Sequence, residues 1–199
     1  MTMEVQFEKS FYPISSWNQG SQPYLASILF CQGRRTTSLS DIDLFAHFCA
    51  AAVPNLAMVE SVDDEKIANR LDRVVASIGR KPLRVLVQVN TSGEESKSGV
   101  DPSGCVELAK HVKLGCPNLE FSGLMTIGML DYTSTPENFK TLSRCRTEVC
   151  QALGITEEQC ELSMGMSADF ELAIEMGSTN VRIGSTIFGP REYPKKEAN

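Results

Sequence analysis

Two short segments near the C-terminus combine residue types that could bind a phosphorylated ring. They are residues 163–167 (SMGMS) and residues 177–189 (GSTNVRIGSTIFG), and in each an apolar strand pattern is followed by small hydroxyl and glycine residues. Glycine lets the backbone come close to a bound group, and hydroxyls and N–H groups at a strand-to-helix turn suit a phosphate. Arg182, inside the second segment, adds a permanent cation at one spot. Together the two segments indicate a pocket for a phosphorylated ring.

Strand and helix patterns alternate from residue 56 onward. Apolar runs predict strands at residues 56–60, 84–90, 119–127, 160–166 and 181–188. Four helical patterns lie between them: one after an S-x-x-D capping box at residues 61–64, one around residues 106–112, one from a Thr135 N-cap to Gly154, and a short one that ends at Gly177. Strict alternation of this kind is typical of a parallel sheet with helical crossovers.

Two α/β architectures fit this order, an open doubly wound sheet and a (β/α)8 barrel of the TIM type. Polar and small residues gather at the C-terminal ends of the predicted strands: Glu60, Asn90, Thr126, Ser167 and Gly184. Barrel active sites lie on that face, and a phosphate often sits in the loops after the last two strands. We therefore favour the barrel, in an incomplete form with about five recognisable βα units.

The first 53 residues do not follow the alternation. Within residues 1–53 we expect at most one strand, at residues 27–31, and a helix over residues 41–52. We therefore divide the chain into an atypical N-terminal segment (1–53), a barrel domain (54–195) and a tail (196–199).

Composition excludes several classes of function. The net charge of −6 and the pI near 5.0 argue against a nucleic-acid surface, and no apolar run approaches the roughly 20 residues of a membrane span. The seven cysteines form no C-x-x-C pair, and the two histidines are not at zinc-ligand spacing, so no metal site is predicted. We interpret the cysteines as reduced structural thiols in an intracellular compartment. The first 15 residues show no signal-peptide pattern.

From residue 54 to residue 195 the chain resembles the pyridoxal-phosphate homeostasis proteins, single-domain barrels related to the N-terminal domain of alanine racemase. The matching stretches are residues 56–62, 87–90, 94–99, 121–127, 163–169 and 177–189, and the last two are the most specific. The resemblance implies a pyridoxal 5'-phosphate site. By this resemblance, the phosphate is expected to bind to the hydroxyl and N–H groups of Ser167 and to the backbone N–H groups of Gly184 and Ser185.

The same resemblance places Arg182 opposite the pyridine nitrogen, with Asn90, Met166 and Met125 around the ring. A guanidinium keeps its proton, so the ring nitrogen would stay neutral and the ring would be a weak electron sink. Simpler interpretations remain open for these residues. Ser167 could be a plain helix N-cap, Arg182 could pair with a carboxylate such as Glu175, and the methionines could be ordinary core.

Residues 1–53 depart from the family pattern. Family members begin with three further strands, the first of which ends in the lysine that forms a Schiff base with the cofactor. Lys9 matches that lysine only faintly, and Lys97 reads as a solvated loop charge. We therefore expect a truncated or altered variant that binds pyridoxal 5'-phosphate weakly and non-covalently, or not at all.

Three functions remain in competition. The first is cofactor homeostasis without catalysis, and the second is a racemase-like enzyme, which needs an active lysine and an opposing acid–base group that the sequence does not show. The third is a non-binding isoform that interacts only with complete family members. We expect a cytoplasmic monomer, with the mitochondrion as the alternative compartment, and neither nucleic-acid nor membrane partners.

Overall fold

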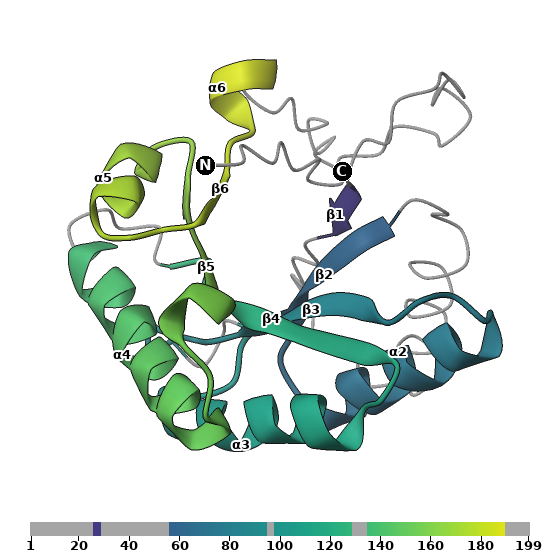
Figure 1. Cartoon of the computed structure of the whole chain (residues 1–199). Helices are drawn as coiled ribbons and strands as arrows, with labels where there is room; N and C mark the ends of the chain where they lie inside the picture. The colour runs from purple at the N-terminus through teal and green to yellow at the C-terminus, as the bar shows by residue number, and fades with distance from the viewer. Residues whose placement is uncertain (1–25, 29–55, 95–97, 129–134, 190–199) are drawn as a thin grey trace, which may run out of the picture.

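The computed structural model describes residues 26–28, 56–94, 98–128 and 135–189. Its strands form one parallel sheet in which the order in space follows the order in sequence, β1-β2-β3-β4-β5-β6. The strands are β1 (Ala26–Ile28), β2 (Leu56–Val62), β3 (Leu83–Gln88), β4 (Leu119–Met125), β5 (Glu161–Met166) and β6 (Asn180–Arg182). The sheet curls into an open arc (Figure 1). This is the order of a (β/α)8 barrel rather than of a doubly wound sheet, so the prediction of an incomplete barrel is confirmed.

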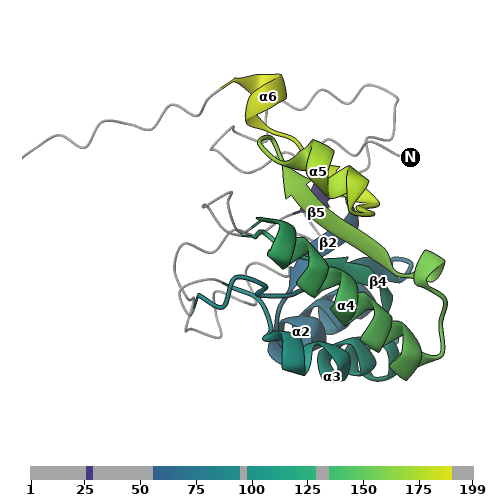
Figure 2. The ribbon, with the colours of Figure 1, turned by 90° about the vertical axis from the view of Figure 1, so that its left-hand side faces the viewer.

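Helices follow the strands as crossovers. They are α2 (Glu65–Ser77), the short η2 (Pro102–Gly104), α3 (Cys105–Lys110), the π-helical η3 (His111–Gly115), α4 (Thr135–Leu153), the short η5 (Glu157–Gln159), α5 (Phe170–Glu175) and α6 (Ser185–Phe188). Helices α2, α3 and α4 line the outer face of the arc, and α5 and α6 lie near its β6 end (Figures 1 and 2).

The core lies between the strands and these outer helices. Outward-facing strand residues such as Val85, Leu124 and Leu162 pack with helix residues such as Leu71 and Leu142 in one continuous apolar cluster. Full burial of side chains of this size is worth about 1.5–3 kcal/mol each, which explains why the strands read as nearly continuous apolar runs.

The inner face of the sheet carries a different set of side chains. A small apolar cluster consists of Met58, Leu86 and Met125. Polar residues flank it toward both ends of the strands, and buried ones among them are Glu60, Gln88, Ser122, Ser163, Asn180 and Arg182. The inner face is therefore the part of the sheet that supplies chemistry.

Several predicted boundaries were wrong. The expected capping box begins within β2, which runs on to Val62, and Asp64 is the N-cap of α2, accepting a hydrogen bond from the Ile67 N–H at 2.7 Å. The expected last strand ends at Arg182, and residues 185–188 turn into α6. The apolar residues Ile187 and Phe188 are exposed there, and a short apolar run does not distinguish a strand from a helix.

The ends of two other strands were also placed too far along the chain. Strand β3 stops at Gln88 and β4 at Met125, each two residues before the expected end, because the chain leaves the parallel ladder for its loop. Val89 forms only an isolated bridge with Val100.

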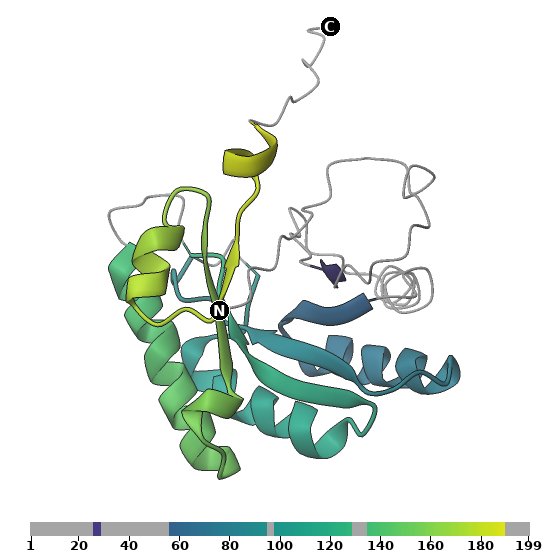
Figure 3. The ribbon, with the colours of Figure 1, turned by 45° about the horizontal axis from the view of Figure 1, so that its top comes forward.

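Of residues 1–53 the structure describes only β1, which pairs in parallel with β2 and overlaps the strand expected at residues 27–31. The helix expected at residues 41–52, Lys9, Lys97 and the tail lie outside the described residues. Figure 3, in which the top of the molecule is tilted toward the viewer, shows the arc with β1 at one end and β6 at the other.

Candidate functional site

Arg182 lies at the C-terminal edge of the sheet, on its terminal strand β6. It is the last residue of β6 and is only 6% exposed. Its Nη1 donates to Ser163 Oγ at 2.7 Å, and its Nη2 donates to the carbonyl oxygen of Thr126 at 2.6 Å. The guanidinium is thus fixed between β5 and the residue that follows β4. A cationic hydrogen-bond donor held in this way can bind an anionic or electron-rich group of a ligand.

The hydrogen bonds continue across the sheet to β2. Ser163 Oγ lies 2.6 Å from Glu60 Oε2, and both side chains are buried. The carboxylate can only accept, so the serine hydroxyl donates to it and accepts from the Arg182 guanidinium. A buried positive charge and a buried negative charge are therefore connected through one hydroxyl.

Ser167 meets the start of α6. Its Oγ accepts hydrogen bonds from the backbone N–H groups of Gly184, at 3.0 Å, and Thr186, at 3.4 Å. The Thr186 hydroxyl donates to the carbonyl oxygen of Ser167 at 3.2 Å. Two N–H groups thus converge on one oxygen, the arrangement that a phosphate oxygen can join or replace.

The simpler interpretations of two site residues do not match these contacts. The N-cap of α5 is Asp169 and not Ser167, and the Asp169 carboxylate accepts from the Met166 N–H at 2.6 Å. Glu175, the suggested partner of Arg182, is exposed on α5, whereas Arg182 is buried. The Ser167 hydroxyl is therefore turned toward the start of α6.

The short helix α5 packs tightly on β5 just before Ser167. Gly165 has φ of +93°, and a Cβ atom there would overlap the Cβ of Ala173 and lie 3.1 Å from Phe170 Cα. Only glycine fits this combination of a left-handed backbone and close helix contact. The packing of α5 on β5 thus holds the turn that carries Ser167 in place.

Asn90 organises the loop after β3. Its Nδ2 donates to the carbonyl oxygen of Glu94 at 2.9 Å, and its Oδ1 accepts from the Ser92 hydroxyl at 2.8 Å. The next residue, Thr91, shares a hydrogen bond of 2.8 Å with the Thr126 hydroxyl, and the Thr126 carbonyl receives Arg182. The loop is therefore tied to the same edge of the sheet, and the predicted contact of Asn90 with a ring remains a prediction.

The other predicted residues take less specific positions. Met166 ends β5 beside Arg182 in the strand register and is partly exposed, whereas Met125 is fully buried in the inner cluster. Ser185 begins α6 and is exposed next to Gly184. The structure thus brings Ser167, Gly184, Ser185 and Arg182 to one edge.

Sequence reasoning assigned no individual role to four contributors: Glu60, Thr126, Ser163 and Thr186. Glu60 and Thr126 were recognised only as polar residues at strand ends, and Ser163 and Thr186 only as members of the two C-terminal segments. The available signal was a glutamate in an otherwise apolar strand, because a carboxylate is buried in such a strand only with partners.

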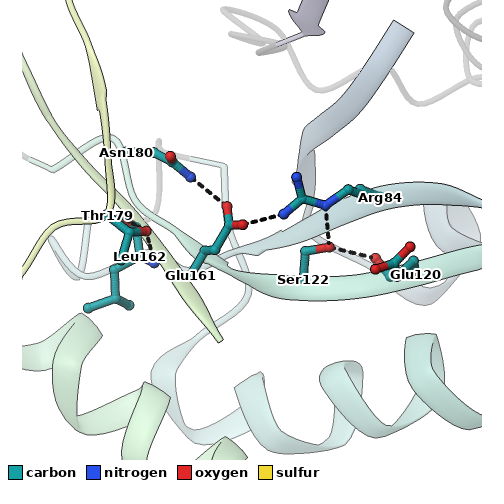
Figure 4. Close-up of polar contacts among 7 residues, drawn as sticks. All are labelled: Arg84, Glu120, Ser122, Glu161, Leu162, Thr179 and Asn180. Atoms are coloured by element: carbon teal, nitrogen blue, oxygen red, sulfur yellow. Dashed lines mark hydrogen bonds and ion pairs between the residues drawn. The ribbon is translucent and has the colours of Figure 1, made fainter. Parts of the chain in front are cut away.

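A second polar cluster occupies the opposite end of the inner face (Figure 4). Arg84 on β3 forms an ion pair with Glu161 on β5, and its Nε donates to Ser122 Oγ at 3.1 Å. Asn180 donates to the second Glu161 oxygen at 2.7 Å. This cluster has the same residue types as the Arg182 network, but it lies at the N-terminal ends of the strands, away from the loops that form sites in this architecture.

The thiols in the described part of the chain are structural. Cys105, Cys116, Cys145, Cys150 and Cys160 are free and buried. Burial raises the pKa of Cys116 to about 11 and that of Cys160 to about 12, so these thiols stay protonated at neutral pH. Within the described ranges no group of three potential ligand residues could hold a metal, and none of the helices there has the length and apolar character needed to cross a membrane.

Known proteins resemble this chain in sequence and in fold. The sequence profile of the "Alanine racemase, N-terminal domain" family matches residues 37–192. The pyridoxal phosphate homeostasis protein of Mus musculus is 54% identical over 151 residues, which cover 74% of this chain and 55% of the relative. The corresponding protein of Vibrio cholerae is 43% identical over 139 residues, which cover 69% of this chain and 57% of the relative. The chain thus spans little more than half the length of these relatives.

Solved structures with a similar fold superpose on this chain. A protein of unknown function from Bifidobacterium adolescentis superposes with a TM-score of 0.66 at 34% identity, covering 83% of this chain and 61% of that one. PipY of Synechococcus elongatus, solved with PLP bound, superposes with a TM-score of 0.63 at 28% identity, covering 83% of this chain and 70% of its own. The chain therefore belongs to the alanine racemase N-terminal domain family, and its curated relatives there are pyridoxal phosphate homeostasis proteins.

Proposed function

We propose that this chain binds pyridoxal 5'-phosphate and takes part in the intracellular homeostasis of that cofactor without catalysing a reaction itself. One observation carries the proposal: a buried, fixed guanidinium and a cluster of convergent N–H groups lie at the same edge of the sheet. The first suits a ring nitrogen and the second a phosphate. The names of the curated relatives and the PLP-bound PipY structure support the choice of cofactor.

The residues present fit such a group. Ser167 and the N–H groups of Gly184 and Thr186 would hold the phosphate, with Ser185 beside them, because both N–H groups already point to one place, the Ser167 hydroxyl oxygen, where a phosphate oxygen can be received. Arg182 would donate to the ring nitrogen while keeping its proton. When bound, the cofactor supplies an aldehyde that reacts with amines.

A covalent link to the protein is not part of the proposal. None of the six described strands contains a lysine, so no lysine amine is placed on a strand of the described sheet. Without it, binding rests on the phosphate and ring contacts, and we propose that it is weak and non-covalent. The same point counts against the racemase-like alternative, which needs an amine and an opposing acid–base group.

The compartment and the oligomeric state belong to the proposal as well. Buried free thiols and the acidic pI suit a cytoplasmic protein, with the mitochondrion as the alternative. We propose a monomer that uses neither nucleic acid nor membrane as a partner.

Equilibrium dialysis against pyridoxal 5'-phosphate tests the site. Arg182→Ala and Ser167→Ala should each raise the Kd about tenfold or more, because each removes a hydrogen bond that involves a charged group. Arg84→Ala is the matched control: it removes an arginine with serine and glutamate partners at the other end of the sheet and should leave the Kd unchanged.

Two outcomes contradict the proposal. Unchanged Kd values in both site variants would place the pocket elsewhere. Failure of the wild-type chain to bind at millimolar cofactor would support the non-binding alternative.

A further inference from the structure

Glu60 is the buried carboxylate of the hydrogen-bond network that ends at Arg182. It lies on the inner face of β2, four strands away from Arg182 in the order of the sheet, and is 1% exposed. Burial of an ionised carboxylate is costly unless the group is hydrogen-bonded and its charge is balanced. The position of Glu60 therefore requires a partner in the barrel interior.

Ser163 supplies the connection. Its Oγ lies 2.6 Å from Glu60 Oε2 and 2.7 Å from Arg182 Nη1. A serine hydroxyl has one proton to donate. A guanidinium can only donate hydrogen bonds and an ionised carboxylate can only accept them, so the direction of both hydrogen bonds is determined. The proton points to Glu60, and the oxygen lone pairs therefore face Arg182.

The common direction of the two hydrogen bonds, from Arg182 to Ser163 and from Ser163 to Glu60, strengthens both of them. Donation to a carboxylate makes the serine oxygen a better acceptor, and a low-dielectric interior increases the effect. The second Arg182 amino group is held by the Thr126 carbonyl at 2.6 Å, so Ser163 and Thr126 both restrain the guanidinium plane. The restraint by Ser163 depends on Glu60.

We propose that Glu60 is the positioning residue of Arg182: through Ser163 it holds the guanidinium in the orientation that meets the ring of the bound ligand. This inference rests on the proposed function for its effect on cofactor binding, but the orientation of Arg182 can be measured without cofactor. Glu60 itself does not touch the ligand.

The Arg84 cluster provides a comparison within the same sheet (Figure 4). It also joins an arginine, a serine and a glutamate. Its charged side chains are 38% and 29% exposed, so water screens the pair and shares its hydrogen bonds. Glu161→Gln is therefore the matched control, since it removes a glutamate charge from an arginine–serine cluster remote from the site.

The first measurement is side-chain NMR of ¹⁵N-arginine in the full chain without cofactor. In the wild type, rotation of the Arg182 guanidinium should be slow, so its Nη protons should give separate resonances. Glu60→Ala should average them, and the isosteric Glu60→Gln, which keeps an acceptor oxygen but loses the charge, should give an intermediate rate. Glu161→Gln should leave the Arg182 resonances unchanged.

The second measurement is the Kd for pyridoxal 5'-phosphate, compared with that for inorganic phosphate. Glu60→Gln should weaken cofactor binding about tenfold, the loss expected for one charge-assisted hydrogen bond. It should leave the phosphate Kd unchanged, because phosphate contacts only the Ser167 region. In an Arg182→Ala background, Glu60→Gln should have no further effect on the cofactor Kd.

The outcomes separate the inference from the proposed function. Unchanged Arg182 dynamics in both folded Glu60 variants would overturn the inference whether or not cofactor binds. Equal losses for cofactor and phosphate, or additive losses with Arg182→Ala, would also overturn it, since Glu60 would then act through general stability. Changed dynamics in a chain that does not bind the cofactor would support the positioning role and refute the proposed function.

Discussion

Replacement of Gly165 by alanine tests how the packing of α5 on β5 supports the site. The new Cβ would overlap the Cβ of Ala173, and the backbone at φ of +93° is unfavourable for an L-residue. The backbone term costs about 1–2 kcal/mol, and overpacking of a closed contact costs about 1–3 kcal/mol. Gly165→Ala should therefore lower the free energy of unfolding by about 2–5 kcal/mol.

Gly177 provides the control for the backbone term. Its φ is +91°, nearly the same as at Gly165, but no atom lies within 4 Å of a Cβ built there. Gly177→Ala should cost only about 1–2 kcal/mol, and the difference between the two variants isolates overpacking. Urea unfolding followed by circular dichroism measures both.

A double-mutant cycle assigns the clash to its partner. In the Gly165→Ala background, Ala173→Gly removes the overlapping methyl group and should recover part of the loss, although the same change alone costs about 1 kcal/mol in a helix. Equal destabilisation by Gly165→Ala and Gly177→Ala, or purely additive effects of Gly165→Ala and Ala173→Gly, would refute the reasoning that close helix packing fixes the turn before Ser167.

Three further predictions follow from local chemistry. Asp64→Ala should lower the free energy of unfolding by about 1 kcal/mol in the same urea assay, since it removes the side-chain cap on the Ile67 N–H. Burial, with repulsion from Asp64, raises the pKa of Asp63 from 3.8 to about 6; the folded state therefore holds the proton more tightly, and this carboxyl lowers stability as pH rises from about 4 to about 6. Asp63→Asn should consequently be more stable than the wild type above pH 6 and lose that advantage near pH 4, and an advantage independent of pH would contradict the assignment. Borohydride reduction in the presence of pyridoxal 5'-phosphate, followed by mass spectrometry, should show no stoichiometric adduct at a unique site, and a single adduct at Lys9 or Lys97 would contradict non-covalent binding.

The order of the elements was readable from the sequence because each βα unit carries its own local signals. Apolar strands buried on both faces, helix periodicity and turn residues such as Gly79 and Gly154 recur from residue 56 onward, and they predicted a parallel barrel-like sheet. The residues around Ser167, Gly184 and Arg182 were singled out from sequence, because small residues, a hydroxyl and an arginine at strand ends are unusual in a buried run; their role in binding a cofactor remains a prediction.

Element ends were less predictable. The run after Arg182 looks like a continuing strand, yet residues 185–188 form α6, in which Ile187 and Phe188 are exposed. Ser61 resembled a helix cap, but pairing with β3 keeps β2 extended to Val62, and the cap passes to Asp64. Local patterns cannot show where a neighbouring strand stops.

The connection between Glu60 and Arg182 was decided by tertiary structure alone. Their sequence separation exceeds one hundred residues, and only the curl of the sheet brings the inner faces of β2, β5 and β6 within reach of one serine hydroxyl. Sequence determines that a carboxylate, a hydroxyl and a guanidinium occupy strand positions. The curvature of the sheet determines which of them meet, because hydrogen bonds between side chains depend on distances that no local pattern records.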